Sequence, residues 1–176
     1  MASPINIDTI PPVRVFPDFP EPGVAFQDLA PLYAEPGLLA RLGDALVEPF
    51  AGAFDTVLAL EARGFVIGTA VAAASRSPLV LARKAGKLPG ALHRSKYALE
   101  YGSAELTVQH GALPPGARVL LVDDVLATGG TMAAAAELAR QSGATVAGCG
   151  VILELVTLGG RKRLAPNPVT SLLTVP

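Results

Sequence analysis

The sequence predicts a single-domain α/β fold with a central, mostly parallel β-sheet flanked by helices. Apolar runs that suit buried strands alternate with helix-like segments along the 176 residues, which is the order that a parallel sheet requires. The composition is 51% hydrophobic and 16% charged, so the chain can bury a core large enough for one sheet and its helices. We therefore expect one domain over residues 1–176, in which residues 1–37 form a proline-rich arm.

The elements follow in chain order. Repeated prolines exclude helix and central strand from the arm, which should lie over the domain as an ordered segment. Apolar patterning then predicts helices over residues 38–50, 64–75 and 130–142, and strands over 56–60, 79–82, 119–122, 145–155 and 171–175. Residues 97–101 and 105–109 indicate the two sides of an exposed excursion that turns at Gly102.

The most informative segment joins a buried strand, two acids and a glycine-rich turn. Asp123 and Asp124 directly follow the strand at 119–122, at the edge where α/β sheets bind ligands. The turn before the next helix consists of Ala127, Thr128, Gly129, Gly130 and Thr131. Its glycines allow close backbone approach, its threonines offer hydroxyls, and the helix start offers free N–H groups, so it predicts a phosphate site. The acids would then face the hydroxyls of an attached ribose. The alternative is an ordinary strand, turn and helix with surface acids.

Other classes are excluded by motif and charge. The chain has neither a G-x-x-x-x-G-K-[ST] loop nor a G-x-G-x-x-G turn after a strand, which excludes a Walker loop and a dinucleotide fingerprint. A net charge of −1 predicts no nucleic-acid or membrane partner. The single cysteine, Cys149, lies in an apolar run and reads as a buried hydrophobe. With no signal-peptide pattern at the start, we expect a cytoplasmic protein.

Two basic segments also follow predicted strands. Arg83, Lys84 and Lys87 stand between glycines and a proline, which favours a shaped anion site over a solvated surface. A departing pyrophosphate needs such charge neutralisation. Arg63 lies where another strand meets a helix and can make a bidentate phosphate contact, although a structural ion pair is the alternative. The third basic run, residues 161–163, is interpreted as a surface feature.

The excursion carries a carboxyl group of its own. Glu100 lies between aromatic neighbours, with Tyr101 beside it and Gly102 after it. Such a segment could close over a substrate, exclude water and present Glu100 to a base. Outside this context, Glu100 would be an ordinary exposed acid.

Together these motifs resemble the adenine phosphoribosyltransferase family, over nearly the whole chain. The resemblance rests on FPDFP and PGVAF in the arm (16–20 and 22–26), EARGF (61–65), RKAGKLPG (83–90), LEYG (99–102) and DDVLATGGT (123–131). It implies a type I phosphoribosyltransferase fold with an N-terminal hood and a flexible catalytic loop. It also implies a purine salvage reaction, in which adenine and 5-phosphoribosyl 1-pyrophosphate give AMP and pyrophosphate.

The resemblance also implies residue roles. Asp123 and Asp124 would bind the ribose hydroxyls, and residues 127–131 would hold the 5-phosphate. Phe26 would stack on adenine while backbone groups near Ala25 and Gln27 read its polar edge; many members have arginine in place of Gln27. Glu100 would be the general acid/base, with Tyr101 in the same loop. Arg63 and the segment of Arg83, Lys84 and Lys87 would bind pyrophosphate, the latter in a neighbouring subunit, which implies a homodimer.

The closing loop is expected to include residues 91–96, in which His93 and Arg94 face either pyrophosphate or solvent, and solvent is favoured. His110 has no predicted partner, and the two histidines make no metal site. Mg²⁺ is the expected cofactor, held mainly by substrate oxygens and water rather than by protein side chains. Two alternative functions are a transferase for hypoxanthine, guanine or xanthine, and a regulator that senses phosphoribosyl pyrophosphate. The first generally uses a lysine to read the base and lacks LEYG, and the second needs a basic face or an added DNA-binding unit.

Overall fold

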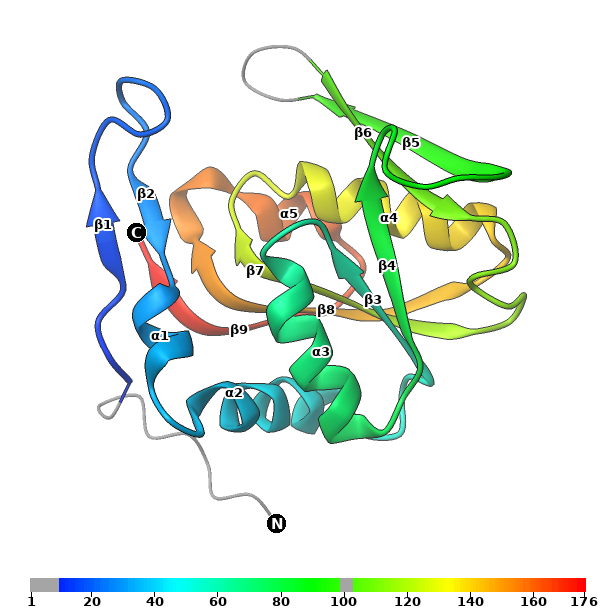
Figure 1. Ribbon diagram of the computed structural model, residues 1–176, viewed down its shortest axis with the longest axis horizontal. Helices are drawn as coiled ribbons and strands as arrows, with labels where there is room; N and C mark the ends of the chain where they lie inside the picture. The colour runs from blue at the N-terminus through cyan, green and yellow to red at the C-terminus, as the bar shows by residue number, and fades with distance from the viewer. Residues whose placement is uncertain (1–9, 99–102) are drawn as a thin grey trace.

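A twisted, mostly parallel sheet forms the centre of the computed structural model, which describes residues 10–98 and 103–176 (Figure 1). Within those residues the sheet has seven strands in the order β5-β6-β4-β3-β7-β8-β9. Its parallel strands are β3 (Thr56–Leu60), β4 (Leu79–Lys84), β7 (Arg118–Leu126), β8 (Thr145–Leu155) and β9 (Val169–Val175). The predicted fold class is thus confirmed.

Helices cover both faces of this sheet. On one face lie α1 (Ala30–Ala34), α2 (Leu38–Val47) and α3 (Gly64–Ser75), and on the other lie α4 (Gly130–Gln141) and α5 (Gly160–Leu164) (Figure 1). Strand β7 shows why two cores form: Val119 and Leu121 pack against α4, whereas Leu120 and Val122 pack against α2 and α3. Side chains alternate along a strand, so an entirely apolar strand must be covered on both faces.

Most predicted elements have the expected bounds. The strand at 56–60, the helix at 64–75 and the strand at 145–155 are found as β3, α3 and β8. The helix expected over 38–50 is α2 followed by a 3-10 turn, η2 (Glu48–Phe50). Several strands are longer than predicted: β4 continues to Lys84, β6 begins at Ser103 and β9 begins at Val169. Strand β7 continues to Leu126, so the paired acids lie inside β7 rather than after it. None of the described helices is long and apolar enough to cross a bilayer.

The excursion is an antiparallel hairpin at the sheet edge, made of β5 (Leu92–Ala98) and β6 (Ser103–Gln109). Strand β5 begins earlier than expected, because residues 92–96 pair with β6 instead of forming a loop. In this segment Arg94 is exposed, as expected, and His93 is partly exposed, but both side chains also have partners that the sequence did not predict. The ring of His93 stacks on that of His110 at 4.1 Å, and Arg94 forms an ion pair with Glu105 at 2.8 Å. Glu100 and Tyr101 lie outside the described residues.

The arm contains two short strands that the sequence did not predict. β1 (Arg14–Phe16) and β2 (Phe26–Asp28) pair antiparallel and stand beside α1 and the carboxyl end of β9 (Figure 1). An ion pair between Arg14 and Asp28 joins them at 2.5 Å. Helices α1 and α5 were missed as well, since five-residue helices are too short to show an apolar period. The arm thus ends in a helix that reaches the main sheet.

Candidate active site

The predicted phosphate turn lies between β7 and α4. Gly129 has a φ of 76° and forms the N-cap of α4, so the turn directs the free N–H groups of a twelve-residue helix toward the space above it. A Cβ on Gly129 would lie 2.9 Å from the carbonyl oxygen of Gly160, which means that α5 packs directly beneath the turn. The geometry therefore suits an anion and leaves no room for a side chain at Gly129.

The paired acids lie next to this turn and reach the first residue of another helix. Asp123 accepts a hydrogen bond from the backbone N–H of Asp124 at 2.9 Å. A Cβ on Gly64, at the start of α3, would lie 2.5 Å from Oδ1 of Asp123, so only glycine allows the carboxyl group to come this close. The sequence predicted no role for Gly64, although a glycine at the start of a helix that follows a strand is a signal of close packing.

Burial determines the electrostatics of the acids. Desolvation, followed by the charge of Asp124, raises the pKa of Asp123 well above its ordinary value. Burial also raises the pKa of Asp124, and the Arg63 guanidinium opposes that increase. A half-buried carboxyl beside a buried one favours ligands that donate hydrogen bonds, such as sugar hydroxyls.

Arg63 connects these acids to the arm. Its Nε lies 2.8 Å from Oδ2 of Asp124, its Nη1 donates to the carbonyl oxygen of Gln27 at 3.2 Å, and its guanidinium lies 5.0 Å from the ring centroid of Phe26. The side chain is half exposed. Arg63 is therefore shared between the site of the acids and the expected purine site.

A pocket of about 780 Å³ separates the arm from the phosphate turn. Its size is within the range of small-molecule sites. The lining includes Ala25 and Gln27 from the arm, Thr128, Gly130 and Thr131 from the turn, and Leu155 and Leu158 beyond β8. A smaller cavity that shares the turn is lined by Asp123. Ala25, Gln27, Asp123 and the turn therefore border the two cavities, whereas Phe26 and Asp124 line neither of them.

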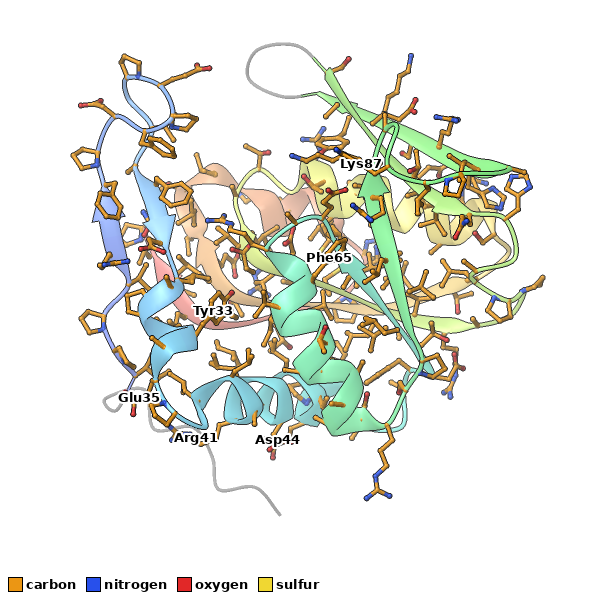
Figure 2. The ribbon with its side chains drawn as sticks, viewed as in Figure 1. Tyr33, Glu35, Arg41, Asp44, Phe65 and Lys87 are labelled. Carbon is orange, nitrogen blue, oxygen red and sulfur yellow. The ribbon has the colours of Figure 1, made fainter. Side chains whose placement is uncertain are left out.

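The predicted pyrophosphate cations lie apart from this pocket. Arg83, at the end of β4, donates to Glu61 at 3.1 Å and lies 5.7 Å from the ring centroid of Phe65. Glu61 also accepts from the backbone N–H of Lys84 at 2.7 Å, and these bonds hold the pKa of Glu61 below its ordinary value although burial raises it. Figure 2 shows Phe65 at the start of α3 and Lys87 in the turn beyond β4. Within the described residues, neither Arg83 nor Lys87 lines the pocket.

The basic run at 161–163 is exposed, as interpreted from the sequence, but two of its residues also make contacts that the sequence did not predict. Arg161 pairs with buried Glu154 and donates to the carbonyl oxygen of Val169 at 2.7 Å and to Ser171 at 3.1 Å. These bonds fix α5, whose first residue, Gly160, supports the phosphate turn. Arg163 lines the pocket. A contact across 7 residues between an exposed arginine and a strand-end glutamate has no local sequence signal.

Comparison with known proteins is consistent with this geometry. The family model described as the phosphoribosyl transferase domain matches residues 33–171, so the fold and the site are those of a phosphoribosyltransferase. Adenine phosphoribosyltransferase of Renibacterium salmoninarum is 52% identical over 157 residues, which are 89% of this chain and 86% of that one.

Solved structures agree. Adenine phosphoribosyltransferase of Rhodothermus marinus superposes with a TM-score of 0.87 at 42% identity, covering 93% of this chain and 94% of that one. The Saccharomyces cerevisiae enzyme, complexed with adenine and an imino-altritol bisphosphate, gives 0.85 at 41% identity, covering 92% and 94%. The chain belongs to the adenine phosphoribosyltransferase family. It converts adenine and phosphoribosyl pyrophosphate to AMP and pyrophosphate, and neither alternative function is favoured.

Proposed function

We propose that the pocket between the arm and the turn holds the phosphoribosyl group on the side of the turn and adenine on the side of the arm. Ala127, Thr128, Gly129, Gly130 and Thr131 bind the 5-phosphate, and Asp123 and Asp124 accept hydrogen bonds from the ribose hydroxyls. The observation that carries this assignment is the placement of a half-buried and a buried carboxyl a few residues before the N-terminus of α4. The phosphate of a phosphoribosyl group suits the free N–H groups at the N-terminus of α4, and its two ribose hydroxyls suit the carboxyl groups.

Adenine binds at the arm in this proposal. The pocket is lined by Ala25 and Gln27, and the ring of Phe26, between them, contacts Phe19 edge to face at 5.3 Å. The amide of Gln27 turns back and donates to the carbonyl oxygen of Ala25 at 3.1 Å. Gln27 therefore stabilises the local arm backbone instead of supplying the cation that arginine supplies in many relatives. Backbone groups of the arm read the polar edge of the base, and Phe26 stacks on its face.

The pyrophosphate is bound by Arg63 and by the cationic turn of a second subunit. Val66, Leu79 and Leu81 leave apolar surface exposed on α3 and β4, at 39%, 36% and 37% of their full areas. These residues adjoin the contact between Phe65 and Arg83, so the apolar surface leads to Lys84 and Lys87. A homodimer that buries this face would bring the turn of each subunit to the other subunit's site.

In the reaction, N9 of adenine attacks the anomeric carbon as the bond to pyrophosphate breaks, and the sugar gains positive charge. Asp123 and Asp124 orient the ribose and offset that charge. Glu100 takes the proton that the purine loses. The proposed cofactor is Mg²⁺, bound mainly through substrate oxygens and water. Bound Mg²⁺ would neutralise the departing pyrophosphate. A reducing cytoplasm is the proposed location, given one buried cysteine.

The ribose assignment is tested by calorimetry with AMP on the Asp124→Asn variant. Replacing the carboxylate weakens a charged hydrogen bond, so AMP should bind about ten- to a hundredfold more weakly. Asp55→Asn is the matched control, because Asp55 pairs with Arg118 at the amino ends of β3 and β7, away from the site. Equal AMP affinity in Asp124→Asn and in the parent protein would show that the ribose assignment is wrong.

A further inference from the structure

Tyr33 carries a polar group for which the reaction described above has no use. It lies in α1 directly after the arm, and its ring packs with the core on the α2 and α3 side of the sheet. In Figure 2 it lies on the side of α1 that faces the sheet. Its hydroxyl is buried and has no hydrogen-bond partner among the described residues. A buried unpaired hydroxyl costs about 1–3 kcal/mol, so its presence needs a reason.

A second unsatisfied atom belongs to the site. Oδ2 of Asp124 is buried and also lacks a hydrogen-bond partner among the described residues. The nearby Nε of Arg63, at 2.8 Å, supplies an opposite charge without the alignment of a hydrogen bond. Only 3% of Asp124 is exposed, so bulk water does not satisfy this oxygen.

These two groups lie on the same side of the sheet. Asp124 follows Leu120 and Val122 on the face of β7 that packs with the cluster to which Tyr33 belongs. Burial, and then the charge of Asp124, raises the pKa of Tyr33, while Arg63 opposes the shift. Tyr33 thus stays protonated and keeps a hydrogen to donate. A phenol donor and a carboxylate acceptor are chemically complementary.

Binding of substrate changes what Arg63 must do. In the structure Arg63 faces Asp124 and Gln27, whereas the proposed function requires it to bind pyrophosphate. Its side chain is 46% exposed and can move outward, but Asp124 would then lose its nearest cation in a buried place. Some other donor must satisfy Oδ2 for Asp124 to stay ionised and oriented.

We propose that Tyr33 is a positioning residue whose hydroxyl donates a hydrogen bond to Oδ2 of Asp124 when the phosphoribosyl substrate is bound. The bond replaces the contact with Arg63 and leaves the other carboxylate oxygen directed at a ribose hydroxyl. This inference rests on the proposed ribose role of Asp124. It adds α1 to the site and couples the release of Arg63 to the orientation of Asp124.

The test is the Tyr33→Phe variant, which removes only the hydroxyl. The KM for phosphoribosyl pyrophosphate and the Kd for AMP should rise about tenfold, as expected for one hydrogen bond to a charged group. The turnover number at saturating substrates and the KM for adenine should stay near the parent values. The thermal unfolding midpoint should be equal or higher, because an unpaired buried hydroxyl is gone. Unchanged Kd and KM values in Tyr33→Phe would overturn the proposal.

Two further variants separate this role from packing and from a failure of the ribose assignment. Tyr33→Leu should show the same loss of AMP affinity together with a lower unfolding midpoint, because it also loses the ring. In an Asp124→Ala background, which has no acceptor, Tyr33→Phe should cause no further loss. A full additional tenfold loss there would show that Tyr33 does not act through Asp124. If Asp124→Asn itself leaves AMP binding unchanged, the ribose assignment fails; if Asp124→Asn weakens binding and Tyr33→Phe does not, only the Tyr33 proposal fails.

Discussion

Arg63 shows how a single side chain can carry several functions that its sequence position hardly reveals. The motif EARGF predicted a phosphate contact or a structural ion pair, and the structure shows the ion pair, with Asp124. It also shows a hydrogen bond to the arm at Gln27. Both partners are far from Arg63 in sequence, so local spacing could not identify them. The pyrophosphate role stays a prediction.

Gly129 offers the sharpest test at the scale of one residue. Gly129→Ala places a Cβ 2.9 Å from the Gly160 carbonyl oxygen, at a φ of 76°. The left-handed conformation costs alanine about 1–2 kcal/mol, and overlap with rigid backbone adds about 1–3 kcal/mol. Chemical denaturation should show this destabilisation, and calorimetry should show AMP binding at least about tenfold weaker, because the phosphate turn must shift.

Gly52→Ala is the matched control for this change. Gly52 has a φ of 74°, but a Cβ there would meet nothing within 4 Å. The residue precedes the amino end of β3, whereas the site lies at the carboxyl ends of the strands. It should lose only the conformational part of the stability and bind AMP like the parent protein. Equal losses of stability in both variants, with AMP affinity intact, would contradict the role assigned to the turn.

At the scale of elements, the small helix α5 matters because it supports the phosphate turn. Glu154 near the end of β8 is buried and accepts hydrogen bonds from Arg161 of α5 and Ser171 of β9. Arg161 also donates to the backbone carbonyl oxygen of Val169. Hydrogen bonding from Arg161 lowers the pKa of Glu154 against the effect of burial. Glu154 therefore stabilises the folded state above its ordinary pKa of 4.5, and that contribution is lost as the pH falls through the lowered value.

Arg161→Met should reveal this contribution as a pH-dependent loss. At pH 7 the variant leaves an unpaired buried carboxylate and should lose about 2–3 kcal/mol of unfolding free energy; the estimate is below that for a fully buried pair because Arg161 is half exposed. Below pH 4 the difference should shrink, since Glu154 is then protonated in the variant. Urea unfolding at several pH values measures it.

Arg140→Met is the control for the loss of one arginine. Its partner, Glu137, lies on the same exposed helix surface, so stability should hardly change. A loss in Arg161→Met that is constant between pH 4 and pH 7 would mean that Glu154 is not the partner that matters.

The sequence predicted long elements well and short ones poorly, for a physical reason. In an apolar strand such as β3, or a helix bounded by glycine such as α4, the apolar pattern and the boundary residues can be recognised within about ten residues of sequence. The arm strands, α1 and α5 have three to five residues each and depend on contacts with distant parts of the chain. The same limit applies to the candidate site: the glycine-rich turn before α4 is local and its geometry was predictable, whereas Gly64, Tyr33 and Arg161 act through neighbours in space.

At the scale of the whole molecule, the placement of the cations determines how many chains make one active site. The pocket lies at the carboxyl ends of β7, β8 and β9, and the acids lie near that end of β7. Lys84, at the end of β4, and Lys87, in the turn after it, follow the exposed apolar surface of α3 and β4. If that surface is an interface between two copies, each Lys87 serves the partner. If the protein acts as a monomer, Lys87 must serve its own pocket. These arrangements differ in a way that mixing experiments can detect.

Complementation between two inactive variants decides between them. Lys87→Ala and Glu100→Gln should each lower the turnover of their homodimers at least about a hundredfold, since one lacks a pyrophosphate cation and the other lacks the general base. When both are unfolded together and refolded, random pairing makes about half of the dimers mixed, and each mixed dimer holds one site with Glu100 and Lys87 intact. Activity should then recover to about one quarter of the parent value, measured as AMP formed at equal total protein. Each variant refolded alone gives the baseline. If Lys87 acts within its own chain, every site in the mixture has one defect, and activity that stays at this baseline would place the cationic turn in its own active site.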